Sequence, residues 1–262
     1  MRRWRVVAPL IVAAGAVVGA CTQVSTSPTR VAALEFDSLP YPSIVTGDSM
    51  RDSTGKVSAL HAVVFNGTGG IIANPSVQYI AFDTGLTIGA GNILTAQARN
   101  GSVRLIAQSG GLESRPLPVL ITRRPDSVIA NSKLVDTLSY DFSLLSYSNK
   151  FGVKLATNDT AGGVSVTQGW LVSYQLFYHG KAVGPNDSTV FTIVHGSAPN
   201  FTSVDTTAQD GTSGRRVRLR LAGLVDTTGA PVTVVATVRY KGVAVRGSPV
   251  TFVLYPVPKP LK

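Results

Sequence analysis

The chain has 262 residues, a formal net charge of +10, 44% hydrophobic residues and 15% charged residues. This composition can form a buried core, which excludes a chain that is disordered throughout, and the length allows two ordinary domains or one large β domain. Glutamate occurs only at Glu35 and Glu113, whereas Val, Thr, Ser and Gly abound. Few good helix formers and many β-branched residues predict an all-β fold.

The N-terminal residues have the pattern of an export signal. Arg2, Arg3 and Arg5 form a positively charged region, and an uncharged apolar run follows over residues 6–20. The run has about fifteen residues, the usual length of the apolar part of a signal peptide, whereas a membrane-spanning helix needs about twenty. We therefore predict a signal peptide over residues 1–20.

The apolar run ends in the sequence VGAC at residues 18–21. An aliphatic residue, two small residues and a cysteine resemble the lipobox of bacterial lipoproteins. The resemblance implies cleavage before Cys21 and a lipid thioether on its sulfur, so that the exported chain would be anchored in a membrane of the cell envelope. Thr22 stands where some lipoprotein families carry an Asp that retains them at the inner membrane, which favours the outer membrane or the cell surface. An ordinary cleaved signal with a chance cysteine and an uncleaved anchor are the alternatives.

Removal of residues 1–20 would leave 21 basic and 14 acidic side chains, a net charge of +7. An exported protein meets no genomic DNA, so we expect no nucleic-acid partner. The positive charge favours binding to envelope polyanions or phospholipid headgroups. The alternative is that the charge serves no specific partner. Since Cys21 is the only cysteine, no intrachain disulfide can form and the fold depends on packing.

After Cys21, the polar residues 22–30 contain a proline and predict a flexible tether. From residue 31 to residue 123, short alternating segments are separated by clusters of Gly, Asn and Asp, which predicts a β-sandwich. The predicted strands of this region are residues 56–65, 77–82, 93–98, 103–108 and 117–122.

Four segments of this region share a family pattern: GDS at 47–49, GNILTA at 91–96, NGSVRLIA at 100–107 and PVLIT at 118–122. They resemble the bacterial immunoglobulin-like (Ig-like) domains of group 2, and the resemblance implies an Ig-like sandwich over residues 31–123. The Trp-x-Ser-Ser element of that group is replaced by VQYIAF at 77–82, where Tyr79 or Phe82 would take the place of the tryptophan.

The segment RRPDS at residues 123–127 breaks the strand pattern and predicts a domain boundary. Residues 124–255 are longer than one standard Ig-like module, so we expect extra strands or a long insertion. The predicted strands are residues 133–145, 151–156, 170–179, 190–194, 216–221, 232–240 and 250–255. The Pro-rich residues 256–262 predict an extended polyproline tail.

The second region also carries a partial family pattern. Its segments are DTTAQDGT at 205–212, RVRL at 216–219, TVVATV at 233–238 and PVTF at 249–252. They resemble the last half of invasin-type (group 1) Ig-like modules, in which a Thr-Asp-x-x-Gly turn opens a strand. The resemblance implies a second, larger Ig-like sandwich, so that the chain would carry two in tandem.

The polar residues show no complete catalytic or metal-binding pattern. Most aspartates directly precede Ser, Thr or Gly, which is typical of turns in which the carboxylate caps its own backbone. Asp48 with Asp52, or Asp205 with Asp210, are alternative candidates for a Ca²⁺ site, which needs about six to eight oxygen ligands.

The three histidines, His61, His179 and His195, have no partner at metal-ligand spacing. The sequence also contains no G-x-S-x-G elbow, no complete dinucleotide fingerprint and no Walker lysine. We therefore predict no metal site, no cofactor and no enzymatic activity.

Residues 170–178 alternate in a way that places Trp170, Tyr174 and Tyr178 on one face of a strand. If exposed, these rings would form a ligand face that stacks on sugars, since aromatic faces offer flat apolar area. The alternative, which we favour, is that the row belongs to the core, where a tryptophan on a sandwich strand is usually found.

Arg216, Arg218 and Arg220 alternate with apolar residues and share one face of their strand. If the strand that ends at Arg239 and Lys241 pairs beside it, the five cations form a patch able to bind phosphate or carboxylate groups. The alternative, which we favour, is a solvated outer face that discourages edge aggregation.

The sequence therefore predicts a non-enzymatic envelope lipoprotein that acts as an Ig-like binding, adhesion or scaffolding module. Its expected partners are the membrane, through the lipid on Cys21, and an envelope polysaccharide or another surface protein. The alternatives are a carbohydrate-binding module that uses the Trp170 face, and an envelope enzyme or its accessory subunit. A concave pocket with clustered carboxylates or histidines of perturbed pKa would favour the enzyme.

Overall fold

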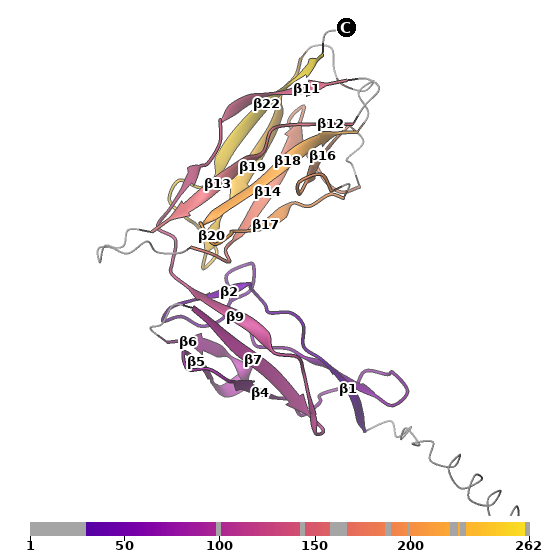
Figure 1. Ribbon diagram of the computed structural model, residues 1–262, viewed down its shortest axis with the longest axis vertical. Helices are drawn as coiled ribbons and strands as arrows, with labels where there is room; N and C mark the ends of the chain where they lie inside the picture. Colours follow the sequence, from indigo (N-terminus) through magenta and orange to yellow (C-terminus); the bar gives the residue numbers. More distant parts are fainter. Residues whose placement is uncertain are drawn as a thin grey trace, which may run out of the picture. The chain divides into compact units, whose positions relative to one another are not determined.

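The computed structural model describes residues 30–97, 101–141, 145–157, 167–186, 190–198, 200–220, 225 and 229–259 (Figure 1). The predicted signal peptide, Cys21 and the tether up to residue 29 lie outside these ranges. Within them the chain forms strands and loops with one short 3-10 turn, Ala90–Asn92. None of the described segments is a helix long and apolar enough to span a membrane. The predicted all-β class is confirmed.

The described residues form two compact units, and the smaller one comprises residues 30–36, 62–78 and 107–114. Its strands are β1 (Val31–Glu35), β3 (Val63–Asn66) and β8 (Leu112–Glu113), together with the end of β7 (Gly101–Ser109). β1 pairs antiparallel with β3, and β8 folds back on the last residues of β7. The intervening turn is Gly110-Gly111, whose φ angles of 56° and 84° are those of a type I′ hairpin.

The larger unit comprises residues 37–61, 79–106 and 115–262. Its first sheet has the order β2-β9-β7-β4, with β2 parallel to β9 and β9 antiparallel to β7, and a separate hairpin joins β5 and β6. The bounds are β2 (Ser43–Val45), β4 (Gln78–Ala81), β5 (Leu86–Ile88), β6 (Leu94–Ala96) and β9 (Leu117–Thr122). Val119 and Ile121 of β9 are buried, because alternate side chains of a strand point to the same face.

Two further sheets of the larger unit enclose a common core. In the first of these sheets, β13 lies between β10 and β18, and β12 and β16 also pair with β18. In the second, the strand order is β11-β22-β19-β14-β15, and β17 pairs with β14. The bounds in the first sheet are β10 (Ser127–Ala130), β12 (Ser146–Tyr147), β13 (Phe151–Ala156), β16 (Phe191–Val194) and β18 (Thr212–Leu219). Those in the second are β11 (Val135–Tyr140), β14 (Leu171–Tyr178), β15 (Lys181–Val183), β17 (Val204–Thr206), β19 (Val232–Thr237) and β22 (Val250–Pro258).

This strand order is that of an Ig-like sandwich. β10, β13, β18 and β16 take the places of strands A, B, E and D in one sheet, and β22, β19 and β14 take those of G, F and C in the other. β11 runs parallel to β22, so the chain crosses from the first sheet to the second between β10 and β11. The Ig-like sandwich predicted for the second region is confirmed.

All described strand ladders join residues within 31–122 or within 127–258, as expected of two tandem sandwiches. The two compact units do not coincide with this division into residues 31–122 and 127–258. Residues 37–61 and most of the first sheet belong to the same compact unit as residues 127–258. The predicted domain boundary at residues 123 and 124 therefore stays a prediction.

The core of the second sandwich is built from alternate residues of both sheets. Phe151 contacts Tyr174 and Phe252 across the core, with ring centroids 6.0 and 5.4 Å apart. Full burial of one aliphatic or aromatic side chain contributes about 1.5–3 kcal/mol relative to its exposure. With Cys21 as the only cysteine, packing of this kind carries the stability of the sandwich.

Several predicted strands are shorter in the structure, such as 133–145, of which β11 covers Val135–Tyr140, and in two of them pairing stops inside the predicted range. Within the predicted strand 56–65, only β3 forms a ladder, whereas the backbone amides of Ser58 and Leu60 donate to the carbonyl oxygens of Met50 and Asn92. The predicted strand 232–240 is interrupted at Val238, after which β20 (Arg239–Tyr240) pairs with β21 (Val243–Ala244) instead of continuing β19. Alternation of apolar residues indicates which face is buried, but it does not say whether a neighbouring strand is present.

The predicted polyproline tail 256–262 is wrong for its first residues. β22 continues through Pro258 and pairs in parallel with β11, with Pro256 opposite Leu138 and Pro258 opposite Tyr140. The ladder with β19 ends at Leu254, so these prolines lie where β22 has a described partner on one side only. Proline lacks a backbone N–H and is tolerated at such an edge.

Candidate functional site

The predicted aromatic ligand face lies inside the sandwich. Trp170 and Tyr174 are buried at 3% and 2% exposure, and Tyr178 is half-buried against Phe191. The Tyr174 hydroxyl and Ser213 Oγ are 2.9 Å apart, and burial raises the pKa of Tyr174 to about 12. The alternation read from the sequence is correct, but the row faces the core and offers no surface for sugar stacking.

The predicted five-cation patch does not form, because the two strands that carry it are not neighbours. Arg216 and Arg218 lie on β18, whose ladder partners are β13, β12 and β16. Arg239 lies on β20 and Lys241 follows it in the turn to β21. Arg216 and Arg218 do alternate with the buried Val217 and Leu219, as predicted, and both are half-buried.

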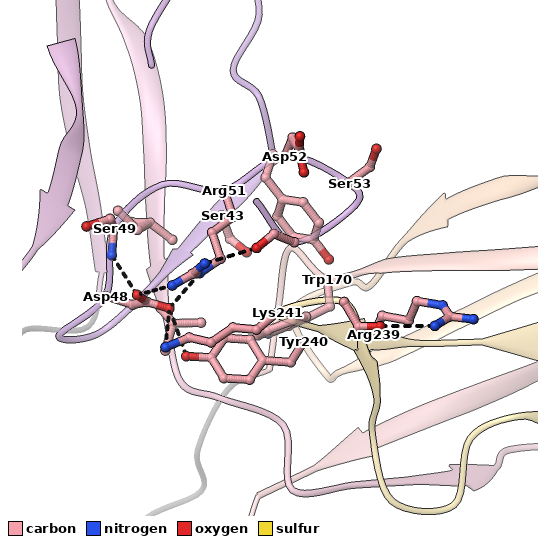
Figure 2. Close-up of a pocket in the computed structure, with 15 residues that line it drawn as sticks. Ser43, Asp48, Ser49, Arg51, Asp52, Ser53, Trp170, Arg239, Tyr240 and Lys241 are labelled. Atoms are coloured by element: carbon pink, nitrogen blue, oxygen red, sulfur yellow. Dashed lines mark hydrogen bonds and ion pairs between the residues drawn. The ribbon is translucent and has the colours of Figure 1, made fainter. Parts of the chain in front are cut away.

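A pocket of about 40 Å³ in the larger unit gathers several polar and aromatic side chains (Figure 2). It lies between the loop that follows β2, the start of β14 and the β20–β21 hairpin. The side chains on which its geometry depends are Tyr41, Asp48, Arg51, Trp170, Tyr240 and Lys241.

Asp48 is the centre of this pocket. Arg51 donates from Nε to Oδ2 at 3.0 Å and from Nη2 to Oδ1 at 2.9 Å, so the guanidinium binds both carboxylate oxygens. Tyr240 donates its hydroxyl to Oδ2 at 2.9 Å, and Lys241 Nζ lies 3.2 Å from the same oxygen. The backbone amide of Ser49 donates to Oδ1 at 2.9 Å. Both oxygens are therefore fully engaged by protein groups.

These contacts determine the charge of the site. Burial by itself would raise the pKa of Asp48, but the hydrogen bonds from Arg51, Tyr240, Ser49 and Lys241 outweigh it and hold the pKa far below its ordinary value. The side chain of Asp48 is only 14% exposed. The carboxylate thus stays ionised over the whole physiological pH range.

The backbone of the β20–β21 turn explains how Lys241 reaches Asp48. Lys241 and Gly242 have φ angles of 52° and 79°, which define a two-residue type I′ turn. Gly55 packs directly on this turn, and a Cβ at position 55 would overlap the backbone of Lys241 and Gly242. Arg51 also donates to the Gly55 carbonyl oxygen at 2.9 Å, a bond within the loop that holds Gly55 in the position from which it packs on the hairpin.

Three aromatic rings form the apolar wall of the pocket. The Trp170 ring contacts Tyr41 and Tyr240 edge-on, with centroids 5.9 and 5.8 Å apart. Trp170 Nε1 donates to the Arg123 carbonyl oxygen at 3.3 Å, and the Leu171 amide donates to the Tyr41 hydroxyl at 2.9 Å. Burial raises the pKa of Tyr41 to about 12, so its hydroxyl stays neutral.

The arrangement is suited to fastening two parts of the unit together and not to acid–base chemistry. A general base needs a free lone pair and a pKa near the working pH, and Asp48 has neither. A volume of about 40 Å³ is also small for a substrate, since small-molecule sites usually have about 300 Å³ or more. The pocket is therefore a structural clamp, which we call the Asp48 clamp: Asp48, Arg51, Tyr240 and Lys241.

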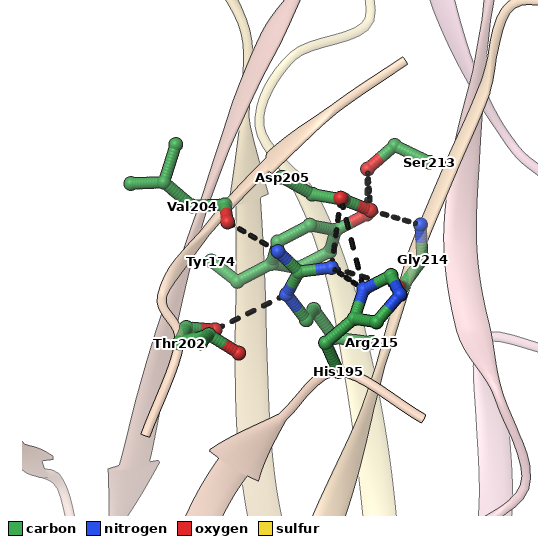
Figure 3. Close-up of polar contacts among 8 residues, drawn as sticks. All are labelled: Tyr174, His195, Thr202, Val204, Asp205, Ser213, Gly214 and Arg215. Carbon is green, nitrogen blue, oxygen red and sulfur yellow. Dashed lines mark hydrogen bonds and ion pairs between the residues drawn. The ribbon is translucent and has the colours of Figure 1, made fainter. Parts of the chain in front are cut away.

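A second polar cluster lies between β17 and β18 (Figure 3). Arg215 is 4% exposed and its Nη1 lies 2.8 Å from Asp205 Oδ1 and 2.7 Å from His195 Nδ1. It also donates to the carbonyl oxygens of Thr202, Gly214 and Val204. Burial would raise the pKa of Asp205, but the Gly214 amide, Arg215 and Ser213 together lower it. The cluster is a satisfied internal ion pair.

The alternative Ca²⁺ sites are not assembled. Asp48 and Asp205 are each bound to an arginine, while Asp52 and Asp210 accept hydrogen bonds from Thr54 and Thr212 within their own turns. In the part of the chain that the structure describes, no three His, Cys, Asp or Glu side chains are grouped to hold a metal ion. The capping role predicted for turn aspartates applies to Asp52 and Asp210.

Sequence reasoning missed both polar clusters. For Arg215 a signal was present, since residues 215, 217 and 219 share one face of β18 and Val217 and Leu219 point to the core. For the Asp48 clamp the spacing of Asp48 and Arg51 was visible, but Tyr240 is 192 residues away from Asp48 and only the fold brings it close.

No protein-family model matches the sequence, and no curated protein matches it. Among solved structures, domains 4 and 5 of the S-layer protein SbsC are similar, with 13% identity, a TM-score of 0.31, and coverage of 87% of this chain and 99% of that chain. The Yersinia pseudotuberculosis adhesin InvE is similar with 12% identity, a TM-score of 0.31, and coverage of 87% and 61%. The class of this protein, an all-β chain with an Ig-like sandwich, is defined by its strand order.

Proposed function

We propose that this chain is a non-enzymatic lipoprotein of the bacterial cell envelope that serves as an Ig-like binding, adhesion or scaffolding module. The observation that carries the proposal is the Asp48 clamp. The polar groups of this pocket bind one another, and they hold the loop after β2 against the β20–β21 hairpin. A chain built in this way presents surfaces on a stiff support, which is what a scaffold or adhesion module needs.

The chemistry of the described polar clusters supports a non-enzymatic role. Catalysis by a carboxylate or an imidazole needs a group that can bind substrate and exchange a proton. The Asp48 and Asp205 carboxylates are instead ionised and paired with arginines. An accessory subunit of an envelope enzyme is compatible with the same arrangement, since such a subunit also works by presenting a surface.

The lipobox-like sequence at residues 18–21 supports attachment to the membrane through Cys21. An envelope polysaccharide or another surface protein would be the second partner. The carbohydrate-binding alternative loses the residues on which it depended, because Trp170 and Tyr174 are buried.

The experiment compares bacterial cells that express the full chain as wild type, Cys21→Ala and the matched control Thr22→Ala. The cells are labelled with a palmitate analogue and separated into membrane and soluble fractions, and intact cells are treated with a protease. We expect the wild type and Thr22→Ala to be labelled, membrane-bound and degraded from outside. Cys21→Ala should lose the label and the membrane retention. Membrane retention of unlabelled Cys21→Ala at the wild-type level would contradict lipid anchoring.

A further inference from the structure

The outward face of the sheet β11-β22-β19-β14 is a continuous surface. Strand alternation places the core residues on one side and the remaining residues on the other, so the outward set follows from the burial patterns. We call this set the outer face: Val135, Thr137, Ser139, Leu171, Ser173, Gln175, Phe177, Ala182, Val204, Thr206, Thr233, Val235, Thr237, Thr251, Val253, Tyr255 and Val257.

The strand registers show that these residues form rows across the sheet. The longest row is Ala182, Phe177, Thr233, Val253 and Val135, which crosses five strands through successive ladder pairs. A second row joins Gln175, Val235 and Thr251. Residues that are direct ladder partners on one face are in side-chain contact, so the rows merge into one patch.

The outer face contains no Lys, Arg, Asp, Glu or His. The full chain, in contrast, carries 24 basic and 14 acidic side chains. Four large apolar residues of the outer face are well exposed, with Val135 at 58%, Val204 at 47%, Tyr255 at 43% and Val257 at 42%. Isolated exposed apolar residues are normal, but the depletion of charged residues over a whole sheet is typical of the centre of a contact surface.

We propose that a second copy of this chain packs on the outer face, so that two sandwiches meet sheet to sheet about a two-fold axis. Charge supports this occupant, because two copies that each keep 21 basic and 14 acidic side chains after removal of residues 1–20, a net charge of +7, repel each other least through a surface without cations. The composition is also self-complementary. Threonine hydroxyls both donate and accept hydrogen bonds, so a face rich in Thr can pair with an identical face.

The size of the outer face suits a stable dimer. The five strands β11, β22, β19, β14 and β15 have 6, 9, 6, 8 and 3 residues, and at about 4.8 Å between strands and about 3.3 Å per residue they cover roughly 500 Å² in projection. Side-chain relief makes the accessible area larger than the projection, and a standard interface buries about 800 Å² on each partner. Two sheets that pack face to face lie about 10 Å apart, which the β-branched side chains of this face can fill.

The first test is cysteine cross-linking in bacterial cells that express the full chain. Thr251→Cys lies on the outer face, and the matched control Ile129→Cys lies on β10 of the opposite sheet, where the native side chain is 53% exposed. The wild type, which has only Cys21, provides the background. With a bismaleimide we expect a cross-linked species of two chains for Thr251→Cys and only the background for Ile129→Cys.

The second test measures the dimer of the full chain by sedimentation velocity in density-matched detergent. Val135→Lys and Thr251→Lys place like charges opposite each other across the two-fold axis, so the dissociation constant of the dimer should rise at least tenfold. Ile129→Lys should leave it unchanged, and all three variants should keep the thermal midpoint of unfolding because the sites are exposed. The dimer goes beyond the proposed function and can form whether or not Cys21 carries a lipid.

Three outcomes would overturn the proposal. One is a wild-type chain that stays monomeric at every concentration, and another is cross-linking of Ile129→Cys as strong as that of Thr251→Cys. The third is that no species of two chains forms and the outer face binds another partner. This partner would be an envelope polysaccharide if Val135→Lys weakens its binding, or a different protein if Thr251→Cys cross-links to it. In that case the outer face serves a foreign ligand and not a second copy.

Discussion

The hydroxyl of Tyr240 donates a 2.9 Å hydrogen bond to Oδ2 of Asp48, which lies 192 residues earlier in the chain. The same carboxylate binds Arg51 from its own loop and Lys241 from the β20–β21 hairpin. One ionised group therefore connects the segment that follows β2 with the Ig-like sandwich of the larger unit.

Asp48→Asn should destabilise the protein by about 1–3 kcal/mol, because Arg51 and Lys241 lose a charged acceptor in a partly buried site. Urea unfolding followed by circular dichroism measures the loss. The matched control is Asp52→Asn, an exposed turn residue in the same loop whose amide oxygen can still accept hydrogen bonds from Thr54. Equal effects of the two substitutions would show that the clamp contributes nothing.

The pH dependence of stability should identify the same carboxylate. The pKa of Asp48 is lowered by folding from an ordinary value of 3.8, so its stabilising effect is complete above that value and is lost as the pH falls towards the lowered pKa. We expect the stability difference between the wild type and Asp48→Asn to be constant from pH 7 to about pH 5 and to shrink below about pH 4. Urea midpoints measured between pH 7 and pH 3 would reveal this. A difference that stays constant down to pH 3 would contradict it.

Trp170 should report a buried environment. After removal of residues 1–20 it is the only tryptophan, it is 3% exposed, and it contacts the rings of Tyr41 and Tyr240. We expect blue-shifted emission that acrylamide quenches weakly, and Trp170→Ala should cost about 3–5 kcal/mol of stability. Red-shifted, readily quenched emission in a cooperatively folded protein would show that the strand face is exposed.

Arg215 and Arg220 should differ sharply although both are arginines at β18 or next to it. Arg215→Ala leaves the Asp205 carboxylate without its partner at a buried site and should cost about 3–5 kcal/mol. Arg220 is exposed just beyond the end of the strand, so Arg220→Ala should change the stability by about 0.5 kcal/mol or less. Chemical unfolding of both variants and the wild type measures the difference, and similar losses would contradict the internal role of Arg215.

Several features follow from the sequence because they depend on neighbours along the chain. Strand alternation predicted that Trp170 and Tyr174 share a face, and the structure has this face in the core. Local hydrogen bonding predicted the turn role of Asp52 and Asp210. The all-β class follows from composition for the same reason, since β-branched residues favour strands wherever they lie.

Only the tertiary structure decided which segments meet. The sequence does not say that Arg239 lies away from β18, that Tyr240 reaches Asp48, or that Pro256 pairs in parallel with Leu138. Nor does it show that the outward sides of β11, β22, β19, β14, β15 and β17 align into one uncharged face. Each of these features depends on the order and register of strands that are far apart in the chain. That order is selected by the packing of the whole core, because no local interaction distinguishes one partner strand from another.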